Sequence, residues 1–393
     1  MKKTLLSAVA FVLGIGAFAQ SKVDTVQFTV VKANPITSIK NQNKSGTCWA
    51  YSSLAFFESE LLRLGKGEHD LAESFVVTKT MLDRATKAVR THGDVSFSQG
   101  GSFYDVLYCL KNYGIVPQTA MAAPGSTYGD TLYNHNELDQ IATAYVNAIA
   151  KGSQKTLSPI WRQGLEKIYD AYMGEIPATF TEKGKTYTPK SYAESLGLKY
   201  DDYVSLTSFN HEPFYSSYVI EVQDNWRWAQ SYNLPIDELM RTMEEAVKNG
   251  YTFAWGADVS EDYFGRRGNS IAKLPSKLGT AHDLKGSDAA RWTGTDGKKA
   301  VEVKDGDEPT VTQEMRQKAY DNWETTDDHG MQIYGLAKDP SGKEYFMVKN
   351  SWGFYGPYKG HFYASKGYVA YKTMNILIHK NAIPKDIRKK LGI

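Results

Sequence analysis

Apolar residues in the first half of the chain recur at the spacing of helices. After Cys48 they return every three or four positions until Gly65, which predicts a helix from 48 to about 64. The same spacing predicts further helices at 71–89, 102–113, 136–175 (two helices) and 236–249. Helices are therefore expected to dominate the first half of the chain.

The last quarter carries shorter apolar runs, which are typical of strands. The final 65 residues predict a β-meander with strands at 330–337, 345–349, 361–364 and 368–371. Further strands are predicted at 203–222 and 251–259, and a short extended arm at 23–40. Because helices and strands are segregated rather than alternating, we expect the α+β class.

The first residues have the pattern of a secretory signal. Two lysines precede an apolar run from Leu5 to Phe18, and the small residues Ala17 and Ala19 stand at the −3 and −1 positions of a cleavage site. The run is too short for a membrane span. The sequence therefore predicts a signal peptide over residues 1–19 and an exported protein, either periplasmic or extracellular.

Length and charge limit the possible classes of protein. The chain has 393 residues, of which 41% are apolar, enough for one elaborate domain or two small ones. It has 46 Lys and Arg against 44 Asp and Glu, and loss of Lys2 and Lys3 with the signal would leave equal numbers. This balance argues against charge-driven nucleic-acid binding. No later stretch is long enough to cross a bilayer, so neither nucleic acid nor membrane is expected as a partner.

The chain has only two cysteines, and their surroundings differ. Cys109 lies in an apolar helical pattern, where a core thiol is expected. Cys48 follows Ser45-Gly46-Thr47 and opens a predicted helix, and a helix N-terminus lowers the pKa of a thiol. A disulfide between the two cysteines is an alternative, because exported proteins commonly form disulfides. The setting of Cys48 nevertheless favours a nucleophile.

Three other residues complete a pattern for acyl transfer. His329 precedes a predicted strand, and Asn350 ends another strand 21 residues later, so adjacent strands would bring the amide to the imidazole. Gln42 lies six residues before Cys48 and could donate a hydrogen bond to an oxyanion. The other seven histidines lie in polar or loop contexts and are expected at the surface or in caps.

The segment from Gln42 to Trp49 resembles the nucleophile motif of the papain-like cysteine peptidases, and Asn350-Ser351-Trp352-Gly353 is similar to their Asn motif. The resemblance implies an α+β fold with a helical half and a β-barrel-like half. It also implies Cys48 as nucleophile, His329 as base, Asn350 as its orienting residue and Gln42 in the oxyanion hole. The implied substrate-binding residues are Gly100, Gly101 and Trp352, with Trp352 also shielding the His–Asn contact.

Within that superfamily the chain resembles the bleomycin hydrolase and aminopeptidase C group, at 110–117, 213–218 and 224–226. From Cys48 to His329 the gap is 281 residues, against 130–150 in papain-type enzymes. The resemblance implies a helical insertion at about 118–245 within a peptidase domain over 20–393. It also implies peptide substrates and a homo-oligomer, a hexamer in that group.

Members of this group restrict cleavage to amino-terminal residues with a C-terminal tail that enters the cleft. This chain ends at Ile393 without the group's Pro-Trp-Asp-Pro-like stretch. Either Ile393 still reaches the cleft of an aminopeptidase, or the same residues serve an endopeptidase. A non-catalytic binding protein on this fold is a third alternative, against which the intact set of Gln, Cys, His and Asn argues.

No cofactor or metal is expected. The sequence has no His-Glu-x-x-His and no Cys-x-x-Cys, and the acidic turn at 304–307 lacks the spacing of a calcium loop. The pocket for the side chain at the cleaved position is expected between Gly100-Gly101 and the strand at 253–259.

Overall fold

The computed structural model describes residues 25–121, 132–260, 262–265, 268–276, 278 and 307–393. The predicted signal peptide at 1–19 lies outside the described residues, as does nearly all of the acidic turn at 304–307. No helix in the described part of the chain is long and apolar enough to cross a membrane.

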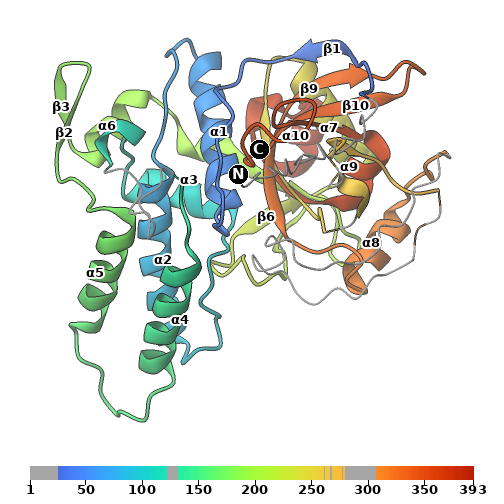
Figure 1. Ribbon diagram of the computed structural model, residues 1–393. Helices are drawn as coiled ribbons and strands as arrows, with labels where there is room; N and C mark the ends of the chain where they lie inside the picture. Colours follow the sequence, from blue (N-terminus) through green and yellow to red (C-terminus); the bar gives the residue numbers. More distant parts are fainter. Residues whose placement is uncertain (1–24, 122–131, 261, 266–267, 277, 279–306) are drawn as a thin grey trace, which may run out of the picture.

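Helices form one half of the molecule (Figure 1). They are α1 (Cys48–Arg63), α2 (Glu73–Arg90), α3 (Phe103–Asn112), α4 (Asn136–Ala150), α5 (Trp161–Met173) and α6 (Pro189–Leu196). A small hairpin of β2 (Phe180–Glu182) and β3 (Lys185–Tyr187) lies beside α6. One apolar core joins these helices, and it includes the fully buried rings of Phe56, Phe57 and Phe75. Burial of each such ring stabilises the fold by about 1.5–3 kcal/mol.

The other half is built on a ten-stranded sheet with the order β5-β6-β4-β12-β7-β9-β10-β11-β8, and β1 pairs with β9 as well. The strands are β1 (Thr29–Ala33), β4 (Tyr203–Thr207), β5 (Ser217–Val219), β6 (Gln230–Asn233), β7 (Phe253–Ala257), β8 (Ile271–Ala272), β9 (His329–Lys338), β10 (Glu344–Lys349), β11 (His361–Ser365) and β12 (Thr373–His379). Around them lie α7 (Ile236–Lys248), α8 (Gln313–Asp321), α9 (Lys366–Lys372) and α10 (Lys385–Leu391). The central strands β7 and β9 are buried along nearly their whole length.

Helix α1 stands between the two halves (Figure 1). It packs against β7 and β9 on one side and against α2 and α3 on the other. Every residue from Trp49 to Leu61 is buried, although the helix includes Ser, Glu and Tyr side chains. A helix that is buried on all sides has a fixed axis, so its first residue, Cys48, is held in place by both halves.

The predicted helices and most strands of the last quarter are confirmed, within one or two residues at their ends. The segment predicted as strand at 203–222 is instead two short strands, β4 and β5, with a loop between them. The strand predicted at 368–371 is wrong, because this segment is the helix α9, and the strand that follows it, β12, was not predicted. The Ser365 hydroxyl accepts a hydrogen bond from the backbone N–H of Tyr368, which caps the first turn of α9. The aromatic and β-branched residues of this short run resemble a strand, but the cap and burial on all sides favour the helix.

The predicted insertion at 118–245 contains elements of two kinds. Helices α4 to α6 belong to the helical half, whereas β4, β5 and β6 join the main sheet and α7 packs beside it. The insertion boundaries and the single peptidase domain over 20–393 stay predictions.

Candidate active site

Cys48 is the first residue of α1, and Thr47 is its N-cap. The N–H groups of Ala50 and Tyr51 both bond to the Thr47 carbonyl, which closes the first turn immediately behind the thiol. Cys48 is partly exposed to a cleft, whereas Cys109 on α3 is buried as expected. Both thiols are free, so the alternative of a disulfide between them is not realised.

The electrostatic setting of Cys48 differs from the sequence prediction. Burial raises the pKa of its thiol to about 12; hydrogen bonds from the backbone N–H groups of Gly330 and Trp49 act in the opposite direction, and the carboxylates of Asp327 and Asp224 raise it further. The lowering expected from the helix N-terminus is thus opposed by burial of the thiol. Desolvation and two nearby negative charges outweigh the two backbone hydrogen bonds, and the thiol needs a base or a neighbouring cation to ionise.

His329 begins β9, directly before the glycine whose N–H bonds the Cys48 thiol. Its Nε2 lies 2.7 Å from Oδ1 of Asn350, which follows the last residue of β10. Antiparallel pairing of Lys349 with Gln332 brings the end of β10 beside the start of β9. The predicted contact between His329 and Asn350 is thus present, and both side chains are buried.

Trp352 covers the imidazole of His329. The two rings are stacked with centroids 5.1 Å apart and planes at 28°. Trp352 is not among the residues that line the cleft. Its position matches the expected shielding of the His–Asn contact, while its expected role in binding substrate stays a prediction.

Gln42 holds the loop that leads to Cys48. Its Nε2 donates to the Ser45 carbonyl at 2.7 Å, and its Oε1 accepts from the Ser351 hydroxyl at 2.6 Å. The side chain is buried and does not line the cleft. The amide nitrogen has a second N–H, so the role in the oxyanion hole is chemically possible and stays a prediction.

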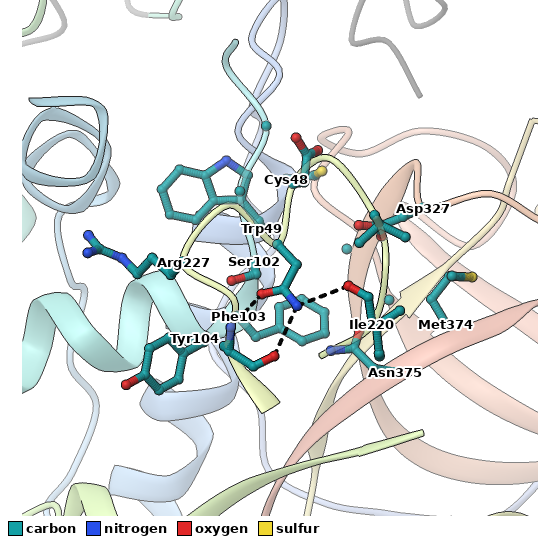
Figure 2. Close-up of a pocket in the computed structure, with 18 of the residues that line it drawn as sticks. Cys48, Trp49, Ser102, Phe103, Tyr104, Ile220, Arg227, Asp327, Met374 and Asn375 are labelled. Carbon is teal, nitrogen blue, oxygen red and sulfur yellow. Dashed lines mark hydrogen bonds between the residues drawn. The ribbon is translucent and has the colours of Figure 1, made fainter. Parts of the chain in front are cut away.

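A cleft of about 1220 Å³ opens in front of Cys48, between residues of both halves of the molecule. His329, Gly100 and Gly101 line it together with Cys48. Figure 2 shows Asp327 beside Cys48, with Met374 and Asn375 on the same side and Trp49 and Arg227 across the pocket. The structure thus brings the predicted nucleophile, base and paired glycines to one cavity.

The two glycines are needed because other groups lie against them. A Cβ on Gly101 would lie 2.8 Å from the Trp49 ring, and a Cβ on Gly100 would lie 2.0 Å from a carboxylate oxygen of Asp224. The indole N–H of Trp49 donates to the Gln99 carbonyl at 3.0 Å, so the segment is also tied to α1. Glycine at these two positions therefore lets the Trp49 ring and the Asp224 carboxylate pack directly against the backbone of the cleft wall.

The strand at 253–259 contributes less to the cleft than expected. Of these residues only Gly256 lines it. The wall is instead formed by β4, β6 and β12, whose lining residues include Tyr203, Ser205, Ser231 and Leu377. These strands were not assigned to the site because their neighbours in the sheet are set by long-range pairing.

The described C-terminal residues lie away from the cleft. The helix α10 is attached to α7 by the ion pairs Arg241–Asp386 and Lys390–Glu238, and Ile393 packs on the core of the sheet half. Ile393 does not line the cleft. The structure therefore does not have Ile393 in the active site, and a preference for amino-terminal residues has to come from other parts of the cleft.

Three residues of the cleft region were missed by sequence reasoning, namely Arg84, Asp224 and Asp327. Arg84 is fully buried in α2 and donates to the Gly100 carbonyl at 2.6 Å and to Asp224 at 3.2 Å. Burial raises the pKa of Asp327 to about 7, and the carboxylates of Asp224 and Asp258 add to the effect. The pair Asp327-Asp328 directly before His329 was the one sequence signal for this charge.

Histidines elsewhere follow the prediction less closely. His135 was expected at the surface or in a cap, but it is buried, and burial lowers its pKa to about 4. His379 fits the expectation of a cap, because its ring accepts a hydrogen bond from the N–H of Asn381. His282 lies outside the described residues. Among the described residues, no group of three or more His, Cys, Asp or Glu is placed to hold a metal ion.

Comparisons with known proteins agree with this architecture. Aminopeptidase G of Lactobacillus delbrueckii subsp. lactis is 24% identical over 407 residues, covering 91% of this chain and 84% of that protein. Aminopeptidase C of Streptococcus thermophilus is 23% identical, covering 88% of this chain and 81% of the relative. The crystal structure of PepW from Lactobacillus rhamnosis HN001 matches with a TM-score of 0.67 at 18% identity, covering 93% and 84%.

An α+β fold with a thiol at the start of a buried central helix, beside a His–Asn pair on the sheet, defines the papain-like cysteine peptidases. The model of the Peptidase C1-like family matches residues 71–289, more than half of the chain. This chain belongs to the Peptidase C1-like family, and it is a cysteine-type peptidase of the aminopeptidase C group. The matched segment includes neither Cys48 nor His329, so the roles of these residues rest on the sequence pattern and the geometry of the cleft.

Proposed function

We propose that this chain is an exported cysteine aminopeptidase that hydrolyses peptides with Cys48 as nucleophile and His329 as base. The observation that carries the proposal is the meeting of Cys48, at the start of α1, with His329 in one cleft, where Asn350 holds the imidazole at 2.7 Å. The nucleophile, its base and the residue that orients the base are the parts that covalent acyl transfer requires.

In the first half of the reaction, His329 accepts the proton of the Cys48 thiol and the sulfur attacks the substrate carbonyl. The raised pKa of the thiol makes this transfer necessary, because little thiolate forms without a positive imidazolium beside it. The oxyanion is stabilised by N–H groups at the start of α1 and by the amide of Gln42. His329 then returns the proton to the leaving amine, which departs and leaves a thioester on Cys48.

In the second half, His329 takes a proton from water, and the hydroxide oxygen attacks the thioester. The collapse of this intermediate breaks the bond to sulfur, returns the proton to Cys48 and releases the new carboxylic acid. Asn350 keeps the imidazole in one orientation throughout, and Trp352 limits the access of water to the His–Asn hydrogen bond. No cofactor enters these steps.

The preference for amino-terminal residues is proposed from the relatives, which are named aminopeptidases C, E and G. The export of the protein is proposed from the sequence alone, from the lysines, apolar run and small residues of 1–19. Both proposals concern how the peptidase is used rather than how it cleaves, and each has its own test. Fractionation of cells that produce the full chain, with mass spectrometry of the mature N-terminus, tests the export and the cleavage after Ala19.

A single digest tests the activity. One peptide is offered in its free and N-acetylated forms, and the products are identified by mass spectrometry. We expect residues to be removed from the free amino end by the wild-type enzyme and by Cys109→Ala, which lacks only the core thiol. Cys48→Ala should yield no products while it keeps its fold by circular dichroism.

The same digest can contradict each part of the proposal. Products from Cys48→Ala would exclude Cys48 as the nucleophile. Internal cleavage of the acetylated peptide at the rate of the free peptide would show an endopeptidase with the same catalytic residues.

A further inference from the structure

Two carboxylates face the cleft beside Cys48, and the reaction described above uses neither. Asp224 lies in the segment between β5 and β6, whereas Asp327 lies two residues before His329. Both line the same cleft as Cys48 and Gly100. Both also raise the pKa of the Cys48 thiol, so their charges act at the position where substrate reacts.

Asp224 is fixed against the paired glycines. Its carboxylate stands where a side chain on Gly100 would begin, at 2.0 Å from the position of that Cβ. Arg84 holds both groups, because one guanidinium nitrogen donates to the Gly100 carbonyl at 2.6 Å and to Asp224 at 3.2 Å. The side chain of Asp224 remains 20% exposed, so part of it is open to the cleft.

Asp327 has a different balance of charges. Within the described residues, its side chain makes no hydrogen bond or ion pair, and it is partly exposed in the cleft. Its neighbour Asp258 is compensated by Lys372 at 3.5 Å and by hydrogen bonds from Ser260 and from the N–H of Thr326. In the described part of the chain, Asp327 therefore interacts with two other acids and has no cation paired with it.

An acidic pair of this kind is stabilised by a cation that enters the cleft. Two nearby carboxylates in a partly desolvated cavity repel each other, and this repulsion disappears when a positive group lies between them. An ammonium group has three N–H donors, which suffice for both carboxylates. We propose that Asp224 and Asp327 bind the free α-ammonium group of a peptide substrate and thereby select chains whose amino terminus lies next to the scissile bond.

This inference rests on the proposed function, in which Cys48 attacks a peptide carbonyl. Both acids line the cleft into which Cys48 opens, so a cation bound by them lies in the same cavity as the reacting carbonyl. In a peptide with a free amino terminus, the main-chain ammonium is such a cation. Asp224 packs against the backbone of Gly100, so a cation that binds it must come close to the cleft wall. A main-chain ammonium does so without the long side chain of Lys or Arg.

The test compares the kcat/KM of matched free and N-acetylated reporter peptides in the wild type, Asp327→Asn and Asp224→Asn. We expect the wild type to prefer the free form and the ratio of free to acetylated to fall about 10–100-fold in Asp327→Asn, the loss typical of one hydrogen bond to a charged group. Asp224→Asn should lower the ratio in the same direction. In the wild type the ratio should rise with pH through about 7, as Asp327 ionises, and this rise should be absent in Asp327→Asn.

Alkylation of Cys48 by iodoacetamide, a neutral probe, separates this inference from the proposed function. In Asp327→Asn it should be as fast as in the wild type or faster, because one charge that raises the pKa of the thiol is gone. An equal loss for free and acetylated peptides would overturn the inference and leave the peptidase assignment intact. A loss of kcat/KM confined to acetylated peptides with an internal Lys or Arg would overturn it as well. That result would show that the acids bind a basic side chain of the substrate rather than its amino terminus. A wild type that is alkylated but cleaves neither peptide would instead contradict the proposed function.

Discussion

Nε2 of His329 and the backbone N–H of Ser351 share one oxygen, Oδ1 of Asn350, at 2.7 Å and 2.8 Å. A backbone N–H bonds only to an acceptor, so this atom is the amide oxygen and His329 must be the donor. In the neutral ring the hydrogen therefore resides on Nε2, and Nδ1 is the basic nitrogen. The pairing of β9 with β10 thus sets the tautomer of the imidazole that we propose as the base for Cys48.

Asn350→Ala should weaken catalysis without abolishing it. The imidazole would lose its orienting acceptor, so we expect kcat/KM to fall about 10–100-fold, less than in Cys48→Ala. Asn350→Asp keeps an acceptor for both N–H groups and should recover part of the rate. Steady-state kinetics on an aminoacyl reporter measures the three variants side by side. A loss in Asn350→Ala as large as that in Cys48→Ala would mean that Asn350 does more than orient the base.

His329→Ala should remove the reactive thiolate. Without an imidazolium, burial and the charges of Asp327 and Asp224 keep the pKa of Cys48 high. We expect iodoacetamide alkylation at pH 5 to slow at least about 100-fold relative to the wild type. Cys109→Ala provides the background, because it leaves one thiol in the chain.

The matched control for this variant is His92→Asn. His92 is exposed and has a φ of 54°, a conformation that Asn tolerates. Its alkylation rate should equal that of the background protein. Equal rates in His329→Ala and the wild type at pH 5 would show that these two residues are not paired.

Most of the helical half and the order of the candidate catalytic residues could be predicted from the sequence, because both depend on local signals, whereas α6 and the β2–β3 hairpin were not predicted. The spacing of apolar residues after Cys48 marks α1, and the order of Gln42, Cys48, His329 and Asn350 gives the chemistry without three-dimensional information. The predicted contact between His329 and Asn350 required one further assumption. The strand that starts at His329 must be adjacent to the strand that ends before Asn350. The pairing of β9 and β10 bears this out.

Features that depend on distant packing were not predicted. The run around Tyr368 has strand-forming residues. It is nevertheless a helix, because the Ser365 hydroxyl caps its first turn and its side chains from Tyr368 to Lys372 are all buried. Asp224 and Asp327 line one cleft although their loops are about a hundred residues apart in the sequence. The raised pKa of Cys48 follows mainly from burial and further from these two carboxylates, and neither can be inferred from the position of a residue at a helix N-terminus.

Gly330→Ala tests how closely β9 must approach α1. A Cβ at this position would lie 2.6 Å from the Ser52 hydroxyl and 3.1 Å from the Phe103 ring. Overpacking of a buried contact costs about 1–3 kcal/mol, and here it would also move the N–H that bonds the Cys48 thiol. We expect a lower midpoint in urea unfolding and a lower kcat.

Ser52→Ala should partly rescue Gly330→Ala, because it removes the atom of the shortest contact. Alone, it should cost only the hydrogen bond from its hydroxyl to the Cys48 carbonyl, about 1 kcal/mol. Stability of the double variant above that of Gly330→Ala is the expected sign of this coupling. If the two effects simply add, the clash lies elsewhere, at Phe103.

Asp327→Asn should stabilise the protein at neutral and higher pH but not in acid. In the folded state the pKa of Asp327 is raised to about 7, mainly by burial and further by Asp224 and Asp258, from an ordinary value near 3.8. Between these two values the folded state binds more protons than the unfolded state, so this residue lowers the free energy of unfolding as pH rises from about 4 to 7. Below about pH 4 both states are protonated and the penalty vanishes.

We expect a gain of roughly 1–3 kcal/mol above pH 7, less than the full shift because the side chain is partly open to water. Urea unfolding of Asp327→Asn, of the wild type and of the exposed-site control Asp201→Asn from pH 4 to 8 measures the difference. A gain that is the same at every pH would show that the carboxylate stays ionised in the folded protein, with its charge compensated by another group.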